Sequence, residues 1–424
     1  MGKHRTTYIM FIFSAFIALL IAGVPSVNAA DDKGMPAAVH SKKQSKITVR
    51  DVPESMKRFK YDSGLSFEYP DAVRGAYLTG HTAGGYKTYM DYKNGERETL
   101  TTPGRKFGHI VEKTEKTDLN AVVIDIKDDW GNITYVPPKD SPLHKYGKPY
   151  INEPRKMLEY LEKKKIYPIA RIVVFKDSVW PKERPDLSFR KNGQVWTNGR
   201  GESFVNPFLA EVWEHNVQVA KEAAKLGFKE IQFDYVRFPE GFEKRDDTLE
   251  YSMGEYKEVD MNNVQKRVKA VTDFVAFAEK ELDQYDVDVS VDIFGYTATL
   301  PEAPGIGQNF TKISQHVDVI SSMIYPSHWT SYFNIAKPDL EPYRLVSEYA
   351  KVENKKLAEL ENPPTSRPWI QDFTASYLGS GNYRVYGKAE VEAQIRALNE
   401  QGIKEYLLWN AANNYTENVD YTPQ

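Results

Sequence analysis

Between residues 73 and 409 the sequence alternates between short strand-like runs and longer amphipathic runs. The strand-like runs are rich in β-branched and aromatic residues; they are Val73–Thr79, Ala121–Lys127, Tyr167–Phe175, Glu230–Phe238, Asp288–Tyr296, Val317–Tyr325, Arg367–Phe373 and Glu405–Trp409. The intervening runs carry apolar residues at three- and four-residue spacing, which predicts helices; they are Glu153–Lys165, Pro207–Leu226, Val264–Gln284, Tyr343–Leu360 and Ala389–Gln401, with weaker ones at Lys106–Thr117 and Gln308–Gln315.

Eight strands alternating with helices predict an α/β chain that folds as a single (β/α)₈ TIM barrel. A doubly wound open sheet is the rival fold. The first strand is followed by Thr79-Gly80-His81 and then Gly84-Gly85. This spacing does not match the glycine fingerprint of dinucleotide-binding folds, so that form of the rival is weakened.

The N-terminal 68 residues differ in composition from the rest of the chain. Lys3, His4 and Arg5 precede an apolar run from Tyr8 to about Val24, and Val27-Asn28-Ala29 resembles a cleavage site. This pattern predicts a secretory signal peptide at residues 1–29, with an uncleaved membrane anchor as the second interpretation. Residues 30–68 are polar and predict a linker, which places the barrel domain at residues 69–424.

Composition excludes several classes of function. The chain has no cysteine, which excludes disulfides, thiolate metal sites and cysteine nucleophiles and is typical of a secreted bacterial protein that does not use disulfides. A net charge of −3 gives no indication of a nucleic-acid partner. His81, His328 and the strand acids lie on different strands without short ligand spacing, so the sequence predicts neither a metal nor a cofactor.

The run Glu230–Pro239 places an acid in the middle of a buried strand. Asp234 and Arg237 lie near its C-terminal end, because Pro239 and Gly241 stop the strand. A buried carboxylate is costly unless it is paired or used in the protein's chemistry.

The alternation of side chains along each strand brings further polar residues to the same end of the barrel. Those predicted to share the barrel mouth are Asp125, Lys127, Arg171, Asp234, Asp292 and Gln371. A buried salt-bridge network is the purely structural interpretation, but such networks are poor stabilisers because desolvation offsets the attraction between the charges. The cluster therefore favours a functional site, in which these residues act on or bind a substrate.

Two acids on adjacent strands suggest glycoside hydrolysis. Asp234, close to Arg171 or Arg237, would stay ionised as a nucleophile or base. Asp292, flanked by apolar residues, would hold a proton as the acid, although the two roles could be exchanged. Strand ends also supply candidate sugar-binding side chains; these are Tyr325, His328, Trp329 and Trp409.

Three segments together resemble the bacterial glycoside hydrolase-like barrel family, which is distantly similar to the alpha-amylase superfamily. The segments are Phe233–Pro239, Val291–Gly295 and Met323–Trp329, within a resemblance that covers about residues 70–415. The resemblance implies a (β/α)₈ barrel and carbohydrate hydrolysis. In amylase-like enzymes a strand-four Asp is the nucleophile and a strand-five Glu is the acid. Asp234 matches the first, whereas Asp292 departs from the second, which leaves the acid and the stereochemical course open.

We therefore expect an exported glycoside hydrolase that cleaves a polysaccharide by a two-carboxylate mechanism. The alternative is a carbohydrate-binding or scaffolding barrel without catalysis. It is motivated by the missing Glu after the fifth strand and by the many aromatic residues in the loops.

Overall fold

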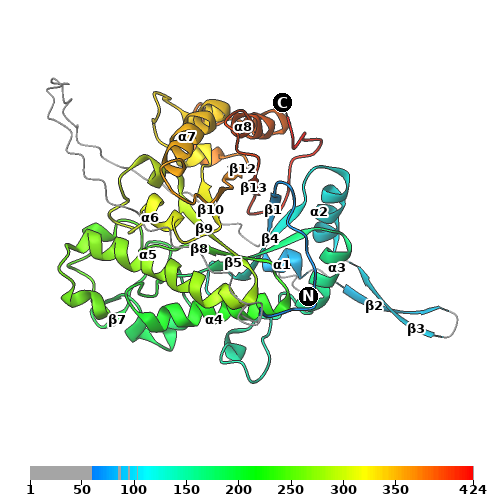
Figure 1. Cartoon of the computed structure of the whole chain (residues 1–424), viewed down its shortest axis with the longest axis horizontal. Helices are drawn as coiled ribbons and strands as arrows, with labels where there is room; N and C mark the ends of the chain where they lie inside the picture. Colours follow the sequence, from blue (N-terminus) through cyan, green and yellow to red (C-terminus); the bar gives the residue numbers. More distant parts are fainter. Residues whose placement is uncertain (1–59, 85–86, 94–95, 103, 424) are drawn as a thin grey trace, which may run out of the picture. The chain divides into compact units, whose positions relative to one another are not determined.

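The computed structural model describes residues 60–423, apart from residues 85–86, 94–95 and 103. Eight parallel strands form a closed barrel in chain order (Figure 1). They are β1 (Arg74–Leu78), β4 (Ala121–Lys127), β5 (Tyr167–Val173), β8 (Glu230–Asp234), β9 (Asp288–Phe294), β10 (Val319–Met323), β12 (Trp369–Gln371) and β13 (Tyr406–Trp409). Because β13 pairs in parallel with β1, the sheet has closed on itself. The predicted (β/α)₈ barrel is confirmed, and the open sheet is wrong.

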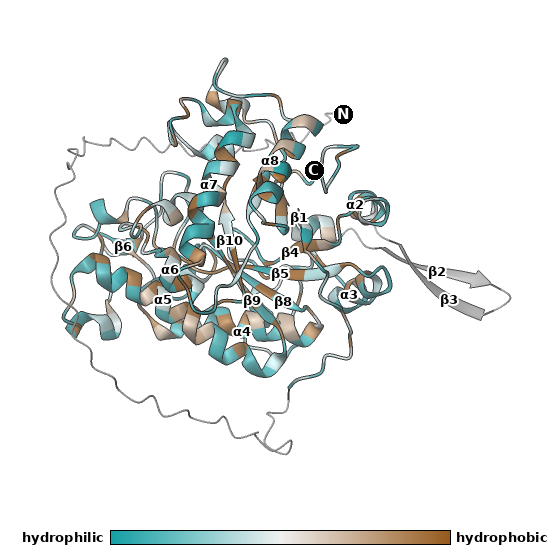
Figure 2. Ribbon diagram, turned by 45° about the horizontal axis from the view of Figure 1, so that its top comes forward, coloured by the Kyte–Doolittle hydropathy of each residue, from teal (hydrophilic) through white to brown (hydrophobic). Residues whose placement is uncertain are grey.

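Helices alternate with these strands along the chain and lie around the outside of the barrel (Figure 2). They are α2 (Arg105–Lys116), α3 (Pro154–Lys163), α4 (Ala210–Leu226), α5 (Asn263–Leu282), α6 (Phe310–Ser314), α7 (Pro342–Leu357) and α8 (Lys388–Glu400). Each corresponds to a predicted helical run. The left-handed C-cap Gly227, at φ 116°, ends α4 and returns the chain directly into β8.

Several short elements were not predicted from the sequence. The longest are β2 (Lys87–Lys93) and β3 (Glu96–Thr102), which pair as an antiparallel hairpin. Others, besides several 3-10 helices, are α1 (Gly80–Ala83), β6 (Arg190–Lys191), β7 (Gln194–Val195) and β11 (Thr365–Ser366). Polar and charged residues outnumber apolar ones in the hairpin sequence, so it has few of the apolar side chains by which a half-buried strand is recognised.

The predicted signal peptide or anchor, and most of the predicted linker, lie outside the described residues. Residues 60–68, the end of that linker, contact the barrel domain. Leu65 is buried in the hydrophobic core, and the Ser66 N–H donates to Glu162 on α3. No helix in the described part of the chain has the length and apolar character to cross a membrane.

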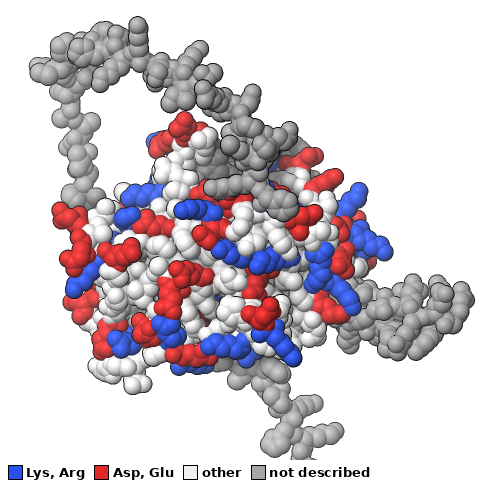
Figure 3. Space-filling model, turned by 60° about the horizontal axis from the view of Figure 1, so that its bottom comes forward, with Lys and Arg blue, Asp and Glu red and all other residues white. Residues whose placement is uncertain are grey.

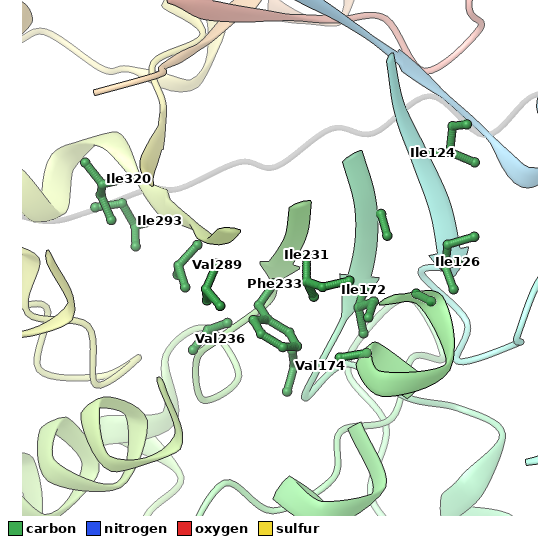
Figure 4. Packing of buried hydrophobic residues seen from close by; sticks show 14 of the residues in the cluster. Ile124, Ile126, Ile172, Val174, Ile231, Phe233, Val236, Val289, Ile293 and Ile320 are labelled. Atoms are coloured by element: carbon green, nitrogen blue, oxygen red, sulfur yellow. The ribbon is translucent and has the colours of Figure 1, made fainter. Parts of the chain in front are cut away.

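Two apolar layers follow from the alternation of strand side chains. The outer layer lies between the strands and the helices, and it includes Ile124, Ile126, Ile172, Ile231, Phe233 and Val289 (Figure 4). The inner layer fills the barrel with Val73, Tyr77, Ala121, Val123, Tyr167, Ile169, Tyr325, Trp369 and Leu407. On the face drawn in Figure 3, acidic and basic side chains intermingle over the surface, as suits a net charge of −3.

A buried ion network closes the N-terminal end of the barrel. The Arg367 guanidinium, just before β12, bonds both carboxylate oxygens of Glu230 at 2.7 Å. It also donates to Glu405 at 2.7 Å and to the Tyr69 hydroxyl at 2.6 Å. Arg367 and Glu230 are fully buried. One cation therefore compensates two acids and ties the start of β8 to the segments that precede β1, β12 and β13.

We expect the substitution Arg367→Ala to lower the free energy of unfolding by about 3–5 kcal/mol, because it leaves two carboxylates buried without their cation. Urea unfolding followed by circular dichroism measures the loss. The matched control is Arg344→Ala, which removes an exposed ion pair with Glu341 and should cost less than about 1 kcal/mol. Equal stability of the two variants would contradict this account of the network.

Candidate active site

Arg171 stands at the centre of a buried polar cluster at the opposite, C-terminal end of the barrel. Its side chain on β5 donates from Nε and Nη2 to Asp234 Oδ2, at 3.0 and 2.6 Å. Its Nη1 donates to Asp125 Oδ1 at 2.6 Å and to Asp129 Oδ2 at 3.3 Å. The active sites of (β/α)₈ barrels form at this end. The structure thus brings three of the predicted residues, Asp125, Arg171 and Asp234, into one hydrogen-bonded group.

Asp234 is the last residue of β8, and both of its oxygens are held. Oδ2 accepts the two bonds from Arg171, and Oδ1 accepts the backbone N–H of Tyr235 at 2.6 Å. Charge-assisted hydrogen bonds of this kind are shorter and stronger than those between neutral groups. Asp234 is therefore fixed in position.

Asp292 lies beside Asp234 on the neighbouring strand β9, since Phe233 and Val291 are partners in the preceding register. Its Oδ1 accepts the indole N–H of Trp369 at 2.8 Å. Burial first, and then the negative charge of Asp234, raise the pKa of Asp292 well above its usual range. Its Oδ2 has no hydrogen-bond partner in the part of the chain that the structure describes, so this oxygen is available to carry a proton to a bound molecule.

Asp125 and Asp129 occupy different electrostatic environments although both touch Arg171. Asp125 also accepts the Tyr77 hydroxyl at 2.5 Å, and burial raises its pKa to about 7 against the opposing charge of Arg171. Burial alone would raise the pKa of Asp129 as well, but Arg171 and Lys176 outweigh it and hold that pKa below its usual value. Asp129 is one quarter exposed and so presents an ionised edge at the mouth.

The structure does not bring Lys127 to this cluster. A bulge between Asp125 and Lys127 shifts the register of β4 against β5, and this rotates Lys127 away from the position that regular alternation predicts. Its Nζ instead makes a 2.8 Å ion pair with the buried Asp177 and a 3.0 Å hydrogen bond to Asn216 on α4.

A different lysine, Lys176, borders the cluster. Its Nζ lies 2.8 Å from Glu202 and 3.4 Å from Asp129. Lys176 and Asp129 were missed from the sequence, because both follow the ends of strands, where alternation no longer predicts direction.

The aromatic residues of the cluster surround the Arg171 guanidinium. Trp409 stacks on Tyr77 with ring centroids 4.2 Å apart, and Arg171 lies 5.4 Å from the Trp409 ring. Trp409 also meets the Trp369 ring edge-on at 5.5 Å. Trp369 was not singled out from the sequence, although alternation from Gln371 places both residues on the same face of β12.

Three more of the predicted residues, Tyr325, His328 and Arg237, lie around this centre. Tyr325 faces the barrel interior, 6.3 Å from the Trp409 ring, and its ring contacts that of His328 at 5.1 Å. Arg237 packs against the rings of Tyr235 and Phe294, at 4.6 and 4.7 Å.

Gln371 and Trp329 make contacts of a structural kind. Gln371 accepts the Ser327 N–H and donates to Asp339, which fixes the loop after β10. Trp329 packs on Tyr349 of α7 with the ring centroids 5.9 Å apart. Trp329 thus lies against α7, whereas Gln371 is on β12, where it is the register partner of Trp409.

Two other features of the described chain bear on ligand binding. An open cavity of about 780 Å³ lies in the loop after β8, lined by Glu243, Asp246, Asp247, Leu249, Tyr251, Ser252, Met253, Lys257 and Asn263. None of these residues belongs to the Arg171 cluster, which is where the chemically distinctive side chains gather. Among the described residues, no group of three His, Asp or Glu side chains is arranged to hold a metal ion.

Comparison with known proteins places the chain in context. The sequence model of a family described as "Putative glycosyl hydrolase domain" matches residues 98–415, three quarters of the chain. The glycoside hydrolase domain of PgaB (BpsB) from Bordetella bronchiseptica is 14% identical, with a TM-score of 0.52 over 81% of this chain and 95% of that one. Its likeness shows the shared barrel fold.

Two further solved structures match with lower TM-scores. A hypothetical protein from Ruminiclostridium thermocellum ATCC 27405 is 27% identical over 51% of this chain and 96% of its own, with a TM-score of 0.40. The glycoside hydrolase domain of PelA from Pseudomonas aeruginosa is 12% identical over 82% of this chain and 97% of its own, with a TM-score of 0.41. No curated protein matches the chain.

The raised pKa of Asp125 predicts a pH dependence of stability. A carboxyl with a higher pKa in the folded chain binds more protons when folded, so it stabilises the fold below about pH 4. This contribution is lost as the pH rises through about 7. We expect the free energy of unfolding of Asp125→Asn to fall less steeply than that of the wild type between pH 5 and pH 7, as measured by urea unfolding. The exposed control Asp140→Asn should parallel the wild type; a parallel curve for Asp125→Asn would contradict the assignment.

Proposed function

The chain belongs to the family described as "Putative glycosyl hydrolase domain", and from this membership and the geometry of the barrel mouth we propose that it hydrolyses glycosidic bonds with Asp234 and Asp292 as its two carboxylates. The observation that carries the proposal is the contrast between two neighbouring acids. Arg171 and a backbone N–H fix the side chain of Asp234, while burial raises the pKa of Asp292 well above its usual range. Glycoside hydrolysis requires such a pair.

The chemistry assigns one role to each acid. Asp292 donates its proton to the glycosidic oxygen as the bond from that oxygen to the anomeric carbon breaks. Asp234 stabilises the positive charge that develops on the sugar ring, and it either attacks the anomeric carbon or takes a proton from the attacking water. The first course retains the anomeric configuration and the second inverts it.

The proposed substrate is a polysaccharide met outside the cytoplasm. The proposed export rests on the apolar N-terminal run and its cleavage-like sequence, which lie outside the described residues. A polysaccharide is supported by the rings of Trp409, Tyr325 and Tyr235 near the carboxylates, since aromatic faces pack well against the apolar face of a sugar. A tether to the membrane through the same N-terminal run is the alternative to release.

We expect the wild-type protein to release reducing ends from at least one glycan in a panel of cell-wall and exported polysaccharides. Asp234→Asn and Asp292→Asn should each lower kcat by roughly 10²-fold or more, because each removes a group that acts in the transition state. Binding of the same glycan should persist. The matched control is Asp247→Asn, on the exposed loop after β8, which should leave kcat unchanged. Glycan binding without any release of reducing ends would support the alternative, a carbohydrate-binding barrel without catalysis.

The bond from Trp369 predicts how the pH profile responds to mutation. The indole N–H stabilises the ionised form of Asp292 and so lowers the pKa of this residue. Without it the pKa rises, and the acid keeps its proton to higher pH. We therefore expect Trp369→Phe to move the alkaline limb of the pH dependence of kcat/KM to higher pH. Trp213→Phe, on the outer helix α4, removes a similar indole bond to the Pro207 carbonyl and should leave the limb in place. A limb that stays or moves to lower pH in Trp369→Phe would refute the assignment of Asp292 as the acid.

A further inference from the structure

Tyr235, directly after Asp234, has a left-handed backbone conformation with φ 52°. Such a conformation is uncommon for any residue with a side chain, and it is retained only where the surroundings enforce it. It also ends β8 at Asp234, four residues earlier than the sequence pattern predicts. An outlier of this kind beside a proposed catalytic carboxylate calls for a physical explanation.

The surroundings hold Tyr235 from two loops. Its carbonyl oxygen accepts the Phe175 N–H at 3.3 Å, from the chain after β5, and the Arg237 N–H at 2.8 Å. Its ring contacts two cations, with Lys176 Nζ 4.7 Å and Arg237 Cζ 4.6 Å from the ring centroid. The ring and the carbonyl are thus fixed independently, so the left-handed conformation is imposed by its contacts.

The left-handed conformation of Tyr235 sets the orientation of the peptide group between Asp234 and Tyr235. The ψ of Asp234 and the φ of Tyr235 rotate the same peptide plane. If the φ of Tyr235 returned to negative values while the flanking chain stayed in place, this peptide plane would therefore flip. The N–H that now donates to Asp234 Oδ1 at 2.6 Å would swing away from the carboxylate. Arg171 holds only the other oxygen, Oδ2, so Oδ1 would lose its bond.

We propose that Tyr235 is a positioning residue whose left-handed backbone fixes the orientation of the Asp234 carboxylate for glycoside hydrolysis. The inference rests on the proposed function and adds a role that depends on the backbone of this residue. Displacements of about 1 Å at a reacting group can cost roughly 10²-fold in rate. The strain at Tyr235 is thereby linked to the alignment of the carboxylate rather than to substrate contact.

Two substitutions separate the backbone from the ring. Tyr235→Asn and Tyr235→Val both remove the ring and its contacts with the two cations. Asn adopts the left-handed conformation more readily than most residues, whereas a β-branched Val strongly disfavours it. We expect the Val variant to have a kcat roughly 10-fold to 100-fold lower than that of the Asn variant, with similar KM values for both. Steady-state kinetics on the glycan that the wild type cleaves measures the ratio.

A second pair of variants provides the same test if the Val variant does not fold. Tyr235→Gly and Tyr235→Ala differ by one methyl group, and only Gly adopts the left-handed conformation without cost. The Ala variant should have the lower kcat of the two. Crystal structures of the pairs should show the bond to Asp234 Oδ1 kept in the Asn and Gly variants and broken in the Val and Ala variants.

The outcomes distinguish this inference from the proposed function. Equal kcat values within each pair, from a wild type that is active, would overturn the positioning role and leave the glycosidase assignment in place. A bond to Oδ1 that persists in the Val and Ala structures would overturn it as well. A wild type that cleaves no glycan in the panel would refute the proposed function, and the positioning role with it.

Discussion

One guanidinium, that of Arg171, supports the whole arrangement at the barrel mouth. It bonds Asp125, Asp129 and Asp234, which come from β4, the loop after β4, and β8. Arg171 and its neighbour Lys176 do not balance the four acids gathered there, and ionised acids without a counter-charge are costly to bury. Protons supply the remaining compensation, as the raised pKa values of Asp125 and Asp292 show. Burial and the shortage of positive charge therefore act together to raise the pKa of these two acids.

An arginine also binds several buried acids at the N-terminal end of the barrel, but there it leaves no carboxylate oxygen of Glu230 unbonded. Arg367 compensates Glu230 and Glu405, and the Ser290 hydroxyl completes the bonding of Glu230 at 2.6 Å. Every oxygen of Glu230 is occupied, which leaves none to receive a substrate. At the mouth, by contrast, Asp292 keeps an oxygen without a partner among the described residues. Between the two ends lies a layer of apolar side chains, yet the negative charge of Glu230 still adds to the rise that burial and Asp234 cause in the pKa of Asp292. The mouth also has an acid that reaches solvent, because Asp129 is one quarter exposed.

Much of this arrangement could be predicted from side-chain alternation alone. Inside a regular strand the direction of each side chain follows from its neighbours, and this located Arg171, Asp234 and Asp292 correctly on the interior face. The same rule applied to β12 would have found Trp369, two residues before Gln371. Alternation fixes direction but carries no information on hydrogen bonds, so it could not predict the bond from the Trp369 indole to Asp292.

The prediction of side-chain direction from the sequence was wrong where the strands end, and the reason is physical. A bulge after Asp125 turns Lys127 toward α4, and a left-handed Tyr235 ends β8 early. Both irregularities break the period of two on which the prediction depends. Strand ends are also where the barrel builds its site, because only there can a strand residue meet a ligand. A perfectly regular β8 would continue past Asp234 and leave its Oδ1 without the Tyr235 N–H. The irregular backbone that defeats the sequence pattern is thus the same backbone that orients the carboxylate.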